Sequence, residues 1–167
     1  MKIILYIVAG LVAILVLLYL AGLAIPAKHV ASRSVVIQAP LDSVWATITD
    51  IAGQPAWRPD LESVEIIGTT DSLLTWIEHP KRGRPLTMRE KNKLAKKRYE
   101  IEIVPGGPFS GYWVGELLET PEGVKFVSTE IGEIHNPIFR TLAYLFFDME
   151  ATIATYQGNL KAYLEKK

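Results

Sequence analysis

The sequence contains no cysteine and only three histidines, His29, His79 and His135, among its 167 residues. Disulfides and thiol chemistry are therefore excluded, and this absence fits either side of a membrane. The histidines lack metal-ligand spacing and no HExxH or CxxC motif occurs, so we expect neither a metal site nor a cofactor. GxGxxG and Walker loops are also missing. In "GPFSG", residues 107–111, the serine stands one place too late for a nucleophile elbow.

Charge is missing from residues 3–27, "IILYIVAGLVAILVLLYLAGLAIPA". About 23 of these residues precede Pro26, and a helix of that length spans roughly 34 Å. A bilayer core is about 30 Å thick. The run therefore predicts an N-terminal transmembrane anchor, residues 1–27, that contacts the membrane through residues 3–25, and a domain over residues 28–167.

Two properties of this run stay open. A cleaved signal peptide is an alternative to a retained anchor, with "GLA" at residues 22–24 as its cleavage site. Lys2 precedes the run, whereas Lys28 and Arg33 follow it. The positive-inside rule therefore does not decide on which side of the membrane the domain lies.

The remaining chain alternates between strand and helix signals. A Pro40 start, Asp42 in the first turn and apolar residues at helical spacing predict a helix over residues 41–51. Gly53 and Pro55 then break it in an elbow that holds Trp57. Segments rich in β-branched residues or with period-two alternation predict seven strands, over residues 32–39, 61–68, 72–79, 84–94, 96–104, 109–119 and 123–133.

The C-terminal segment predicts one long helix over residues 136–165. Asn136 is a capping residue, and Pro137 suits the first helical position. Apolar residues then recur every three or four positions up to Tyr163. Consecutive strands with short loops imply an antiparallel sheet, and this helix would cover its apolar face.

Two stretches resemble the helix-grip superfamily, which includes START-related, Bet v 1-like and polyketide cyclase/dehydrase-like (SRPBCC) proteins. They are "SRSVVIQAPLDSVWATITDIAGQPAWRPDLESVEI", residues 32–66, and "GEIHNPIFRTLAYLF", residues 132–146. The resemblance covers residues 32–165. It implies an α+β fold in which a curved antiparallel sheet of about seven strands wraps around a long C-terminal helix. In that family a cavity between sheet and helix binds lipids, sterols, hormones or aromatic polyketides.

By this resemblance, the elbow and the strand aromatics are candidates to line the cavity. Core packing is the alternative for each of them, and the elbow is interpreted both as a structural corner and as the border of a cavity. The candidate ligand-binding residues are Trp57, Trp76, Met88, Glu90, Tyr99, Tyr112, Trp113, Leu142 and Phe146.

Glu90 shares a strand face with Leu86 and Met88. If that face lines an apolar cavity, burial would raise the pKa of Glu90, and its carboxyl group could orient a ligand or act as a general acid or base. The alternative is a pair with a neighbouring arginine at the rim. Glu90 and His79 are the weak catalytic candidates.

Nine basic residues and one acidic residue lie between residues 81 and 98, whereas the rest of residues 28–167 has eight basic and 17 acidic residues. One interpretation is a solvated hairpin. Another is contact with anionic lipid headgroups. Nucleic acid is disfavoured, because few aromatics are interleaved. The candidate membrane-surface residues are Arg89, Lys91, Lys93, Lys96, Lys97 and Arg98.

Together these patterns predict a single-pass membrane protein that binds a hydrophobic small molecule or lipid and sequesters, presents or transfers it. The alternatives are a polyketide cyclase/dehydrase-type enzyme and an interaction module without a ligand. An enzyme needs at least two titratable groups that converge on one reacting atom. The sequence shows no pair with dependable spacing.

Overall fold

The computed structural model describes residues 2–107 and 109–166. Helix α1 (Lys2–Ala24) precedes strand β1 (Lys28–Ile37), helix α2 (Leu41–Thr49) and the single 3-10 turn η1 (Gln54–Ala56). Six strands follow: β2 (Leu61–Thr70), β3 (Leu73–Pro80), β4 (Leu86–Leu94), β5 (Arg98–Ile103), β6 (Ser110–Thr120) and β7 (Gly123–Glu133). The last two helices are α3 (Pro137–Phe146) and α4 (Met149–Glu165).

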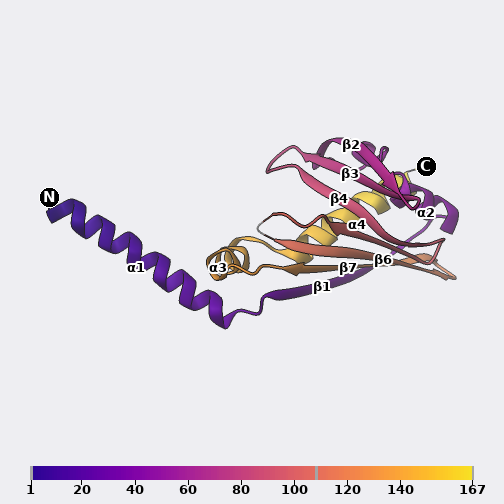
Figure 1. Ribbon diagram of the computed structural model, residues 1–167. Coiled ribbons are helices and arrows are strands. Elements are labelled where there is room, and N and C mark those ends of the chain that lie inside the picture. Colours follow the sequence, from indigo (N-terminus) through magenta and orange to yellow (C-terminus); the bar gives the residue numbers. More distant parts are fainter. Residues whose placement is uncertain (1, 108, 167) are drawn as a thin grey trace.

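The strands form one antiparallel, seven-stranded sheet in the order β1-β7-β6-β5-β4-β3-β2. Strands β2 to β7 are joined as successive hairpins, and β1 pairs with β7. Register shifts in β2 and β4 mark bulges, which bend strands and help the sheet to curl. Helix α4 lies along the inner side of this curled sheet (Figure 1). The predicted helix-grip fold is therefore confirmed.

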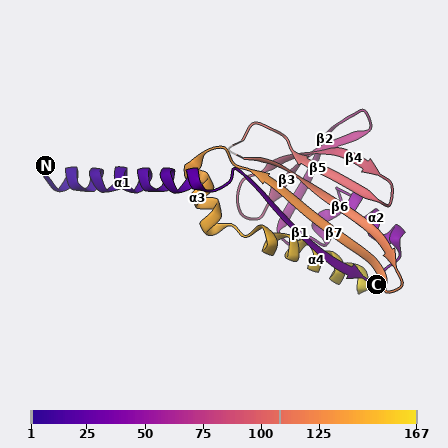
Figure 2. The ribbon, with the colours of Figure 1, turned by 90° about the horizontal axis from the view of Figure 1, so that it is seen from below.

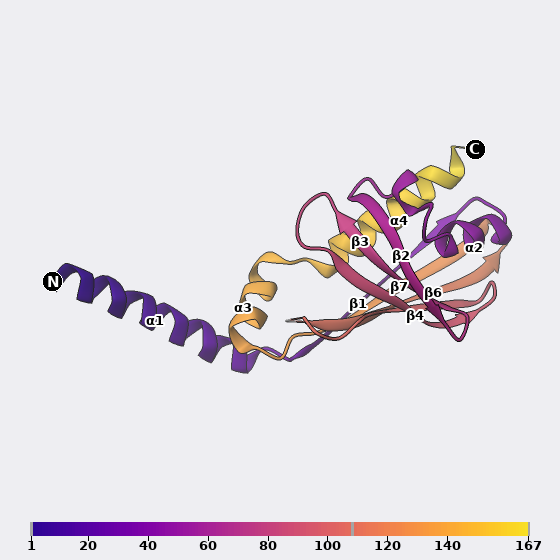
Figure 3. The ribbon, with the colours of Figure 1, turned by 45° about the horizontal axis from the view of Figure 1, so that its top comes forward.

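The two ends of the sheet differ in what surrounds them (Figures 1 and 3). At one end β1 begins, β7 ends, and the β3–β4 and β5–β6 connections lie beside α1 and α3. We call this the α1 end. At the opposite end, the distal end, lie the β4–β5 and β6–β7 turns and the start of α2.

The elbow after α2 is a packed corner. Val44 and Ile48 bury one face of α2 in the core. The helix ends at Thr49, two residues earlier than the sequence predicts, and the Gly53 N–H donates to Asp50 Oδ1 at 3.0 Å. Trp57 is 6% exposed and stacks edge-on against Tyr156 of α4, with ring centroids 5.0 Å apart. The elbow thus joins α2 to the helix that the sheet grips.

The prediction of one continuous helix over residues 136–165 is wrong. Its start is confirmed, since Asn136 Oδ1 accepts hydrogen bonds from the backbone N–H groups of Ile138 and Phe139. The helix breaks at Phe147, whose backbone is extended, and Asp148 caps a second helix by accepting from the Ala151 N–H at 3.0 Å. The apolar spacing continues through this break, so periodicity alone did not reveal it.

Helix α3 packs on α1. The Thr141 hydroxyl donates to the Leu18 carbonyl at 2.8 Å. A Cβ added at Gly22 would lie 1.9 Å from the carbonyl oxygen of Pro137, so only glycine permits this approach of the two backbones. Helix α1 itself projects away from the sheet, and α3 runs across its C-terminal end (Figure 2).

Candidate functional site

The strand register places most of the candidate ligand residues on the inner face of the sheet, toward α4. Trp76 pairs with Met88, and Trp113 pairs with Ile101, which in turn pairs with Glu90. Tyr99, two residues before Ile101, therefore faces the same side.

Tyr112 does not join this group. It alternates with Trp113 and faces the outer side, where Lys91 Nζ lies 4.8 Å from its ring centroid. Leu142 and Phe146 belong to α3 rather than to the gripped helix, and Phe146 is 81% exposed. Tyr112 and Phe146 therefore do not share a space with the inner-face residues.

In the distal part of the inner face, buried side chains fill the space between the sheet and α4. Tyr99 and Phe126 have no exposed surface there, and Trp76, which pairs with Met88 nearer the α1 end, has none either. The ring of Tyr99 lies between those of Trp45 and Trp113, at centroid distances of 6.1 and 6.4 Å. This part of the molecule is core.

Toward the α1 end the inner face is only half-buried. The inward-facing residues there that keep some solvent exposure are Met88, Ile103, Trp113 and Glu130. The break at Phe147 explains why, because it directs α3 onto α1 instead of continuing α4 along the sheet. An apolar surface with one carboxyl group is therefore left accessible.

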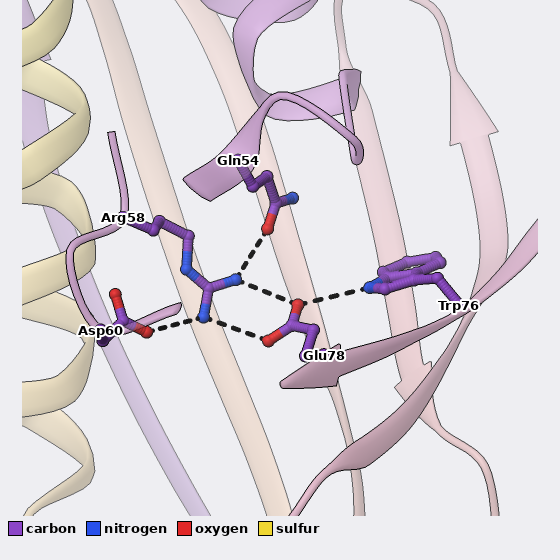
Figure 4. A network of polar contacts seen from close by, with 5 residues as sticks. All are labelled: Gln54, Arg58, Asp60, Trp76 and Glu78. Carbon is purple, nitrogen blue, oxygen red and sulfur yellow. Dashed lines mark hydrogen bonds and ion pairs between the residues drawn. The ribbon is translucent and has the colours of Figure 1, made fainter. Parts of the chain in front are cut away.

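A polar cluster anchors the elbow to strand β3 (Figure 4). Arg58 donates to both carboxylate oxygens of Glu78, at 3.0 and 3.1 Å, a bidentate arrangement. It also donates to Gln54 at 2.7 Å and to Asp60 at 3.0 Å. The Trp76 indole N–H donates to Glu78 at 3.4 Å. Burial alone would lower the pKa of Arg58, but the charges of Glu78 and Asp60 raise it.

Glu130 is the unusual carboxyl group of this region. It lies opposite Trp113 across the β6–β7 pair and is half-buried. Within residues 2–107 and 109–166 its side chain makes no hydrogen bond or ion pair. Burial raises the pKa of Glu130 to about 7, although the nearby positive charge of Arg58 acts in the opposite direction. A carboxyl group in this state can donate or accept a proton near neutral pH.

Tyr156 of α4 joins these two groups. Arg58 Cζ lies 5.7 Å from the centroid of its ring, and the Trp113 ring is 5.6 Å away. Burial raises the pKa of Tyr156, so its phenol stays protonated at neutral pH. Arg58, Glu130 and Tyr156 therefore form a set of titratable groups that converge on the inner face.

The sequence analysis did not select Glu78, Glu130 or Tyr156. The available signal was the alternation of β7, which places Glu130 on the same face as the buried Phe126 and Ser128. A charged residue at such an inward position is uncommon unless it has a partner or a role.

Glu90 behaves differently from the prediction of a raised pKa, which is wrong. It is buried on the inner face, where burial would raise its pKa. Hydrogen bonds from the Tyr99 hydroxyl at 2.7 Å, the Leu74 N–H at 2.9 Å and Lys93 Nζ at 3.0 Å outweigh this and lower it. The alternative of an arginine partner is wrong as well. Glu90 is a satisfied structural carboxylate.

His79, the other catalytic candidate, lies apart. It alternates with the inward-facing Glu78, so it faces outward, and its Nε2 is 3.5 Å from Glu65 Oε2. His79 and Glu90 do not converge. Within the described ranges 2–107 and 109–166, no three His, Asp or Glu side chains gather closely enough to hold a metal ion.

Most of the six candidate membrane-surface residues, which belong to the β4–β5 hairpin, form ion pairs with acidic neighbours. Arg89 pairs with Glu102, Lys93 with Glu90, Arg98 with Glu100 and Glu116, and Lys96 with Asp42 at the start of α2. The turn of this hairpin lies at the distal end, far from α1 (Figure 3). Its position favours the solvated-hairpin interpretation over contact with headgroups at the anchor.

Two surface hollows lie away from the space between α4 and the inner face. One, of about 200 Å³, is on the outer side at the α1 end and includes Tyr112 and Glu102. The other, of about 450 Å³, is at the distal end between α2 and Leu164.

The family described as polyketide cyclase / dehydrase and lipid transport matches residues 28–165. The chain belongs to this family. No curated protein sequence matches the chain significantly.

Solved structures agree on the fold. The Zhui aromatase/cyclase from Streptomyces sp. R1128 superposes with a TM-score of 0.68 at 16% identity, over 83% of this chain and 94% of that chain. Norcoclaurine synthase from Thalictrum flavum gives 0.63 at 16% identity, over 84% and 96%. A START superfamily protein from Mycobacterium smegmatis gives 0.60 at 13% identity, over 83% and 98%.

Proposed function

We propose that this protein is a membrane-anchored helix-grip protein that binds a hydrophobic small molecule or lipid on the inner face of its sheet, at the α1 end. One observation carries the proposal. Glu130, a carboxyl group without a partner among the described residues, stands beside Trp113 on an apolar surface that stays half-exposed. Binding sites combine such apolar surface with a few convergent polar groups.

Different side chains would make different contributions to binding. Met88, Ile103 and Trp113 supply apolar contact, and burying this surface under a ligand drives association. Glu130 is partly protonated near neutral pH, and in that form it can donate a hydrogen bond to a ligand oxygen. The Arg58–Glu78 pair fixes the elbow that walls the site.

Helix α1 supports the anchor part of the proposal. It has 23 residues and is long and apolar enough to cross a membrane. Arg140 donates to the Gly22 and Ile25 carbonyls, at 2.9 and 2.8 Å. Cleavage after residue 24 would remove Gly22 and its contact with Pro137, so these bonds favour a retained anchor over a cleaved signal peptide.

Native mass spectrometry of the full chain tests the binding proposal. The protein is extracted with its surrounding lipid into polymer nanodiscs, and bound molecules are identified after organic extraction. Met88→Trp fills the inner face, whereas Leu118→Trp adds the same bulk at an outward residue that is 62% exposed. We expect a molecule that co-purifies with the wild type and Leu118→Trp but not with Met88→Trp. Equal occupancy in both variants would contradict binding at this site. A wild type that is empty and takes up no lipid probe would contradict ligand binding altogether and favour an interaction module.

The convergence of Glu130, Arg58 and Tyr156 favours a second candidate function, acid–base catalysis on a bound substrate. A carboxyl group with a pKa of about 7 can take a proton from a carbon acid or return one. With a molecule identified by the extraction as substrate, Glu130→Gln should abolish turnover and keep binding. Turnover that survives in Glu130→Gln would exclude Glu130 as the acid or base.

A further inference from the structure

Helix α3 and the residue after it expose an unusually apolar surface. Its exposed members, which we call the α3 apolar surface, are Phe139 (50%), Tyr144 (68%), Leu145 (59%), Phe146 (81%) and Phe147 (59%). Residues 137–147 contain a single charged residue, Arg140. Several large apolar side chains exposed on one short helix favour a protein or membrane contact.

The guanidinium group of Arg140 forms its hydrogen bonds within the protein. Its guanidinium donates to the carbonyls of Gly22 and Ile25 at the end of α1, and also to those of Ile134 and His135. A cation that bonds the last carbonyls of a helix caps it and complements its dipole. The cap leaves no charge on the α3 apolar surface and ties α3 to the C-terminal end of α1.

The direction of α3 identifies what covers this surface. Helix α3 crosses the end of α1 rather than continuing along it (Figure 2). If α1 spans a bilayer, its C-terminal end lies where hydrocarbon gives way to headgroups, and α3 lies across that boundary. Aromatic residues prefer this boundary, and apolar helices that lie in its plane bury their side chains there.

We propose that the α3 apolar surface is embedded in the membrane interface beside α1, with lipid as its occupant. This inference rests on the proposed anchor. It gives the domain a fixed orientation in which the α1 end of the sheet is nearest the lipid surface. The β3–β4 loop, which carries the exposed Lys81, Arg82 and Arg84, lies at this end (Figure 3). A hydrophobic ligand then passes between bilayer and inner face with little exposure to water.

The absence of cysteine makes the test direct, because each introduced cysteine is the sole labelling site. Full-length Phe146→Cys, Tyr144→Cys and Leu118→Cys are spin-labelled and reconstituted in vesicles of phosphatidylcholine and phosphatidylglycerol, 3:1. Leu118 is the matched control, as exposed as Tyr144 but at the distal end. A fourth variant, Leu11→Cys in α1, reports on the anchor. Accessibility to oxygen, which concentrates in lipid, is compared with accessibility to a water-soluble nickel chelate.

We expect oxygen to relax the labels at residues 144 and 146 more strongly than the chelate does, and the reverse order at residue 118. A chelate-dominated label at both α3 positions, with residue 11 embedded, would overturn the inference and leave the anchor intact. Labels that are immobile and protected from both reagents would overturn it in favour of a protein partner or a second copy. A chelate-accessible residue 11 would overturn the anchor and the inference together, whereas the co-purification experiment reports on ligand binding independently.

Discussion

Replacing Glu130 with glutamine should stabilise the protein at alkaline pH and leave it unchanged at acidic pH. Glutamine has the shape of the protonated carboxyl group without its ability to ionise. The pKa of Glu130 is raised from 4.5 to about 7 in the folded protein because the side chain is buried without a partner among the described residues. The ionised form is therefore disfavoured in the fold and favoured in the unfolded chain.

The sign and size follow from proton linkage. Between pH 4.5 and about 7 the folded protein holds a proton that the unfolded chain has released, so the stability falls as pH rises. A tenfold change in proton affinity is worth about 1.4 kcal/mol, so the loss reaches at most about 3 kcal/mol above pH 7. Glu130→Gln should recover up to that amount at pH 8 and nothing at pH 4.5.

Urea unfolding of the full chain in detergent micelles, followed by tryptophan fluorescence, measures the difference. The wild type and Glu130→Gln are compared at pH 4.5 and pH 8, with Glu119→Gln, at an exposed position of β6, as control. Taking the difference between variants cancels the titration of all other groups. A Glu130→Gln protein that is equally or less stable than the wild type at pH 8 would refute the reasoning, because it would mean that the carboxylate is solvated or paired.

Three further predictions concern stability and packing. Glu90→Leu should destabilise the fold by about 3 kcal/mol in urea unfolding at pH 7, because it leaves the buried Tyr99 hydroxyl and the partly buried Leu74 N–H without their acceptor. Since the pKa of Glu90 is lowered, the wild type should itself lose stability as pH falls below 4.5. Arg58→Met should cost about 3–5 kcal/mol by stranding Glu78, and an unchanged urea midpoint would show that the pair contributes little. Gly22→Val should speed backbone hydrogen exchange across α3, because a side chain at residue 22 would clash with Pro137. Gly10→Val is the control, since a Cβ there meets nothing within 4 Å. Equal exchange rates in the two variants would contradict the α1–α3 packing.

Local signals predicted the elements and one contact well. The Asn136–Pro137 helix start is decided by neighbouring residues and was confirmed. The shared strand face of Met88 and Glu90, which follows from alternation, was confirmed as well. The pairing of Arg58 with Asp60 was also within reach, since two positions separate them. Such features depend on residues close in sequence, so they can be predicted from the sequence alone.

The candidate site was harder to predict because its partners come from distant strands. Whether the buried Glu90 carries a raised or a lowered pKa depends on Tyr99 and the Leu74 N–H, which the register brings to it. The net charge of the segment between residues 81 and 98 suggested an anionic ligand, yet the acids that neutralise it lie on other elements, such as Asp42. Electrostatic partners are chosen by tertiary proximity and not by composition.

The sequence by itself determined the seven strands, the antiparallel hairpins, the long apolar N-terminal helix and the family, because periodicity, turns and caps are local properties of the chain. Only the tertiary structure decided that the last helix breaks at Phe147, that α3 leaves the sheet to pack on α1, and that Glu130 stands without a partner on the inner face among the described residues. These features arise where segments more than a hundred residues apart meet, such as Thr141 and Leu18. The free energy of such a contact depends on both segments, so neither segment alone predicts it.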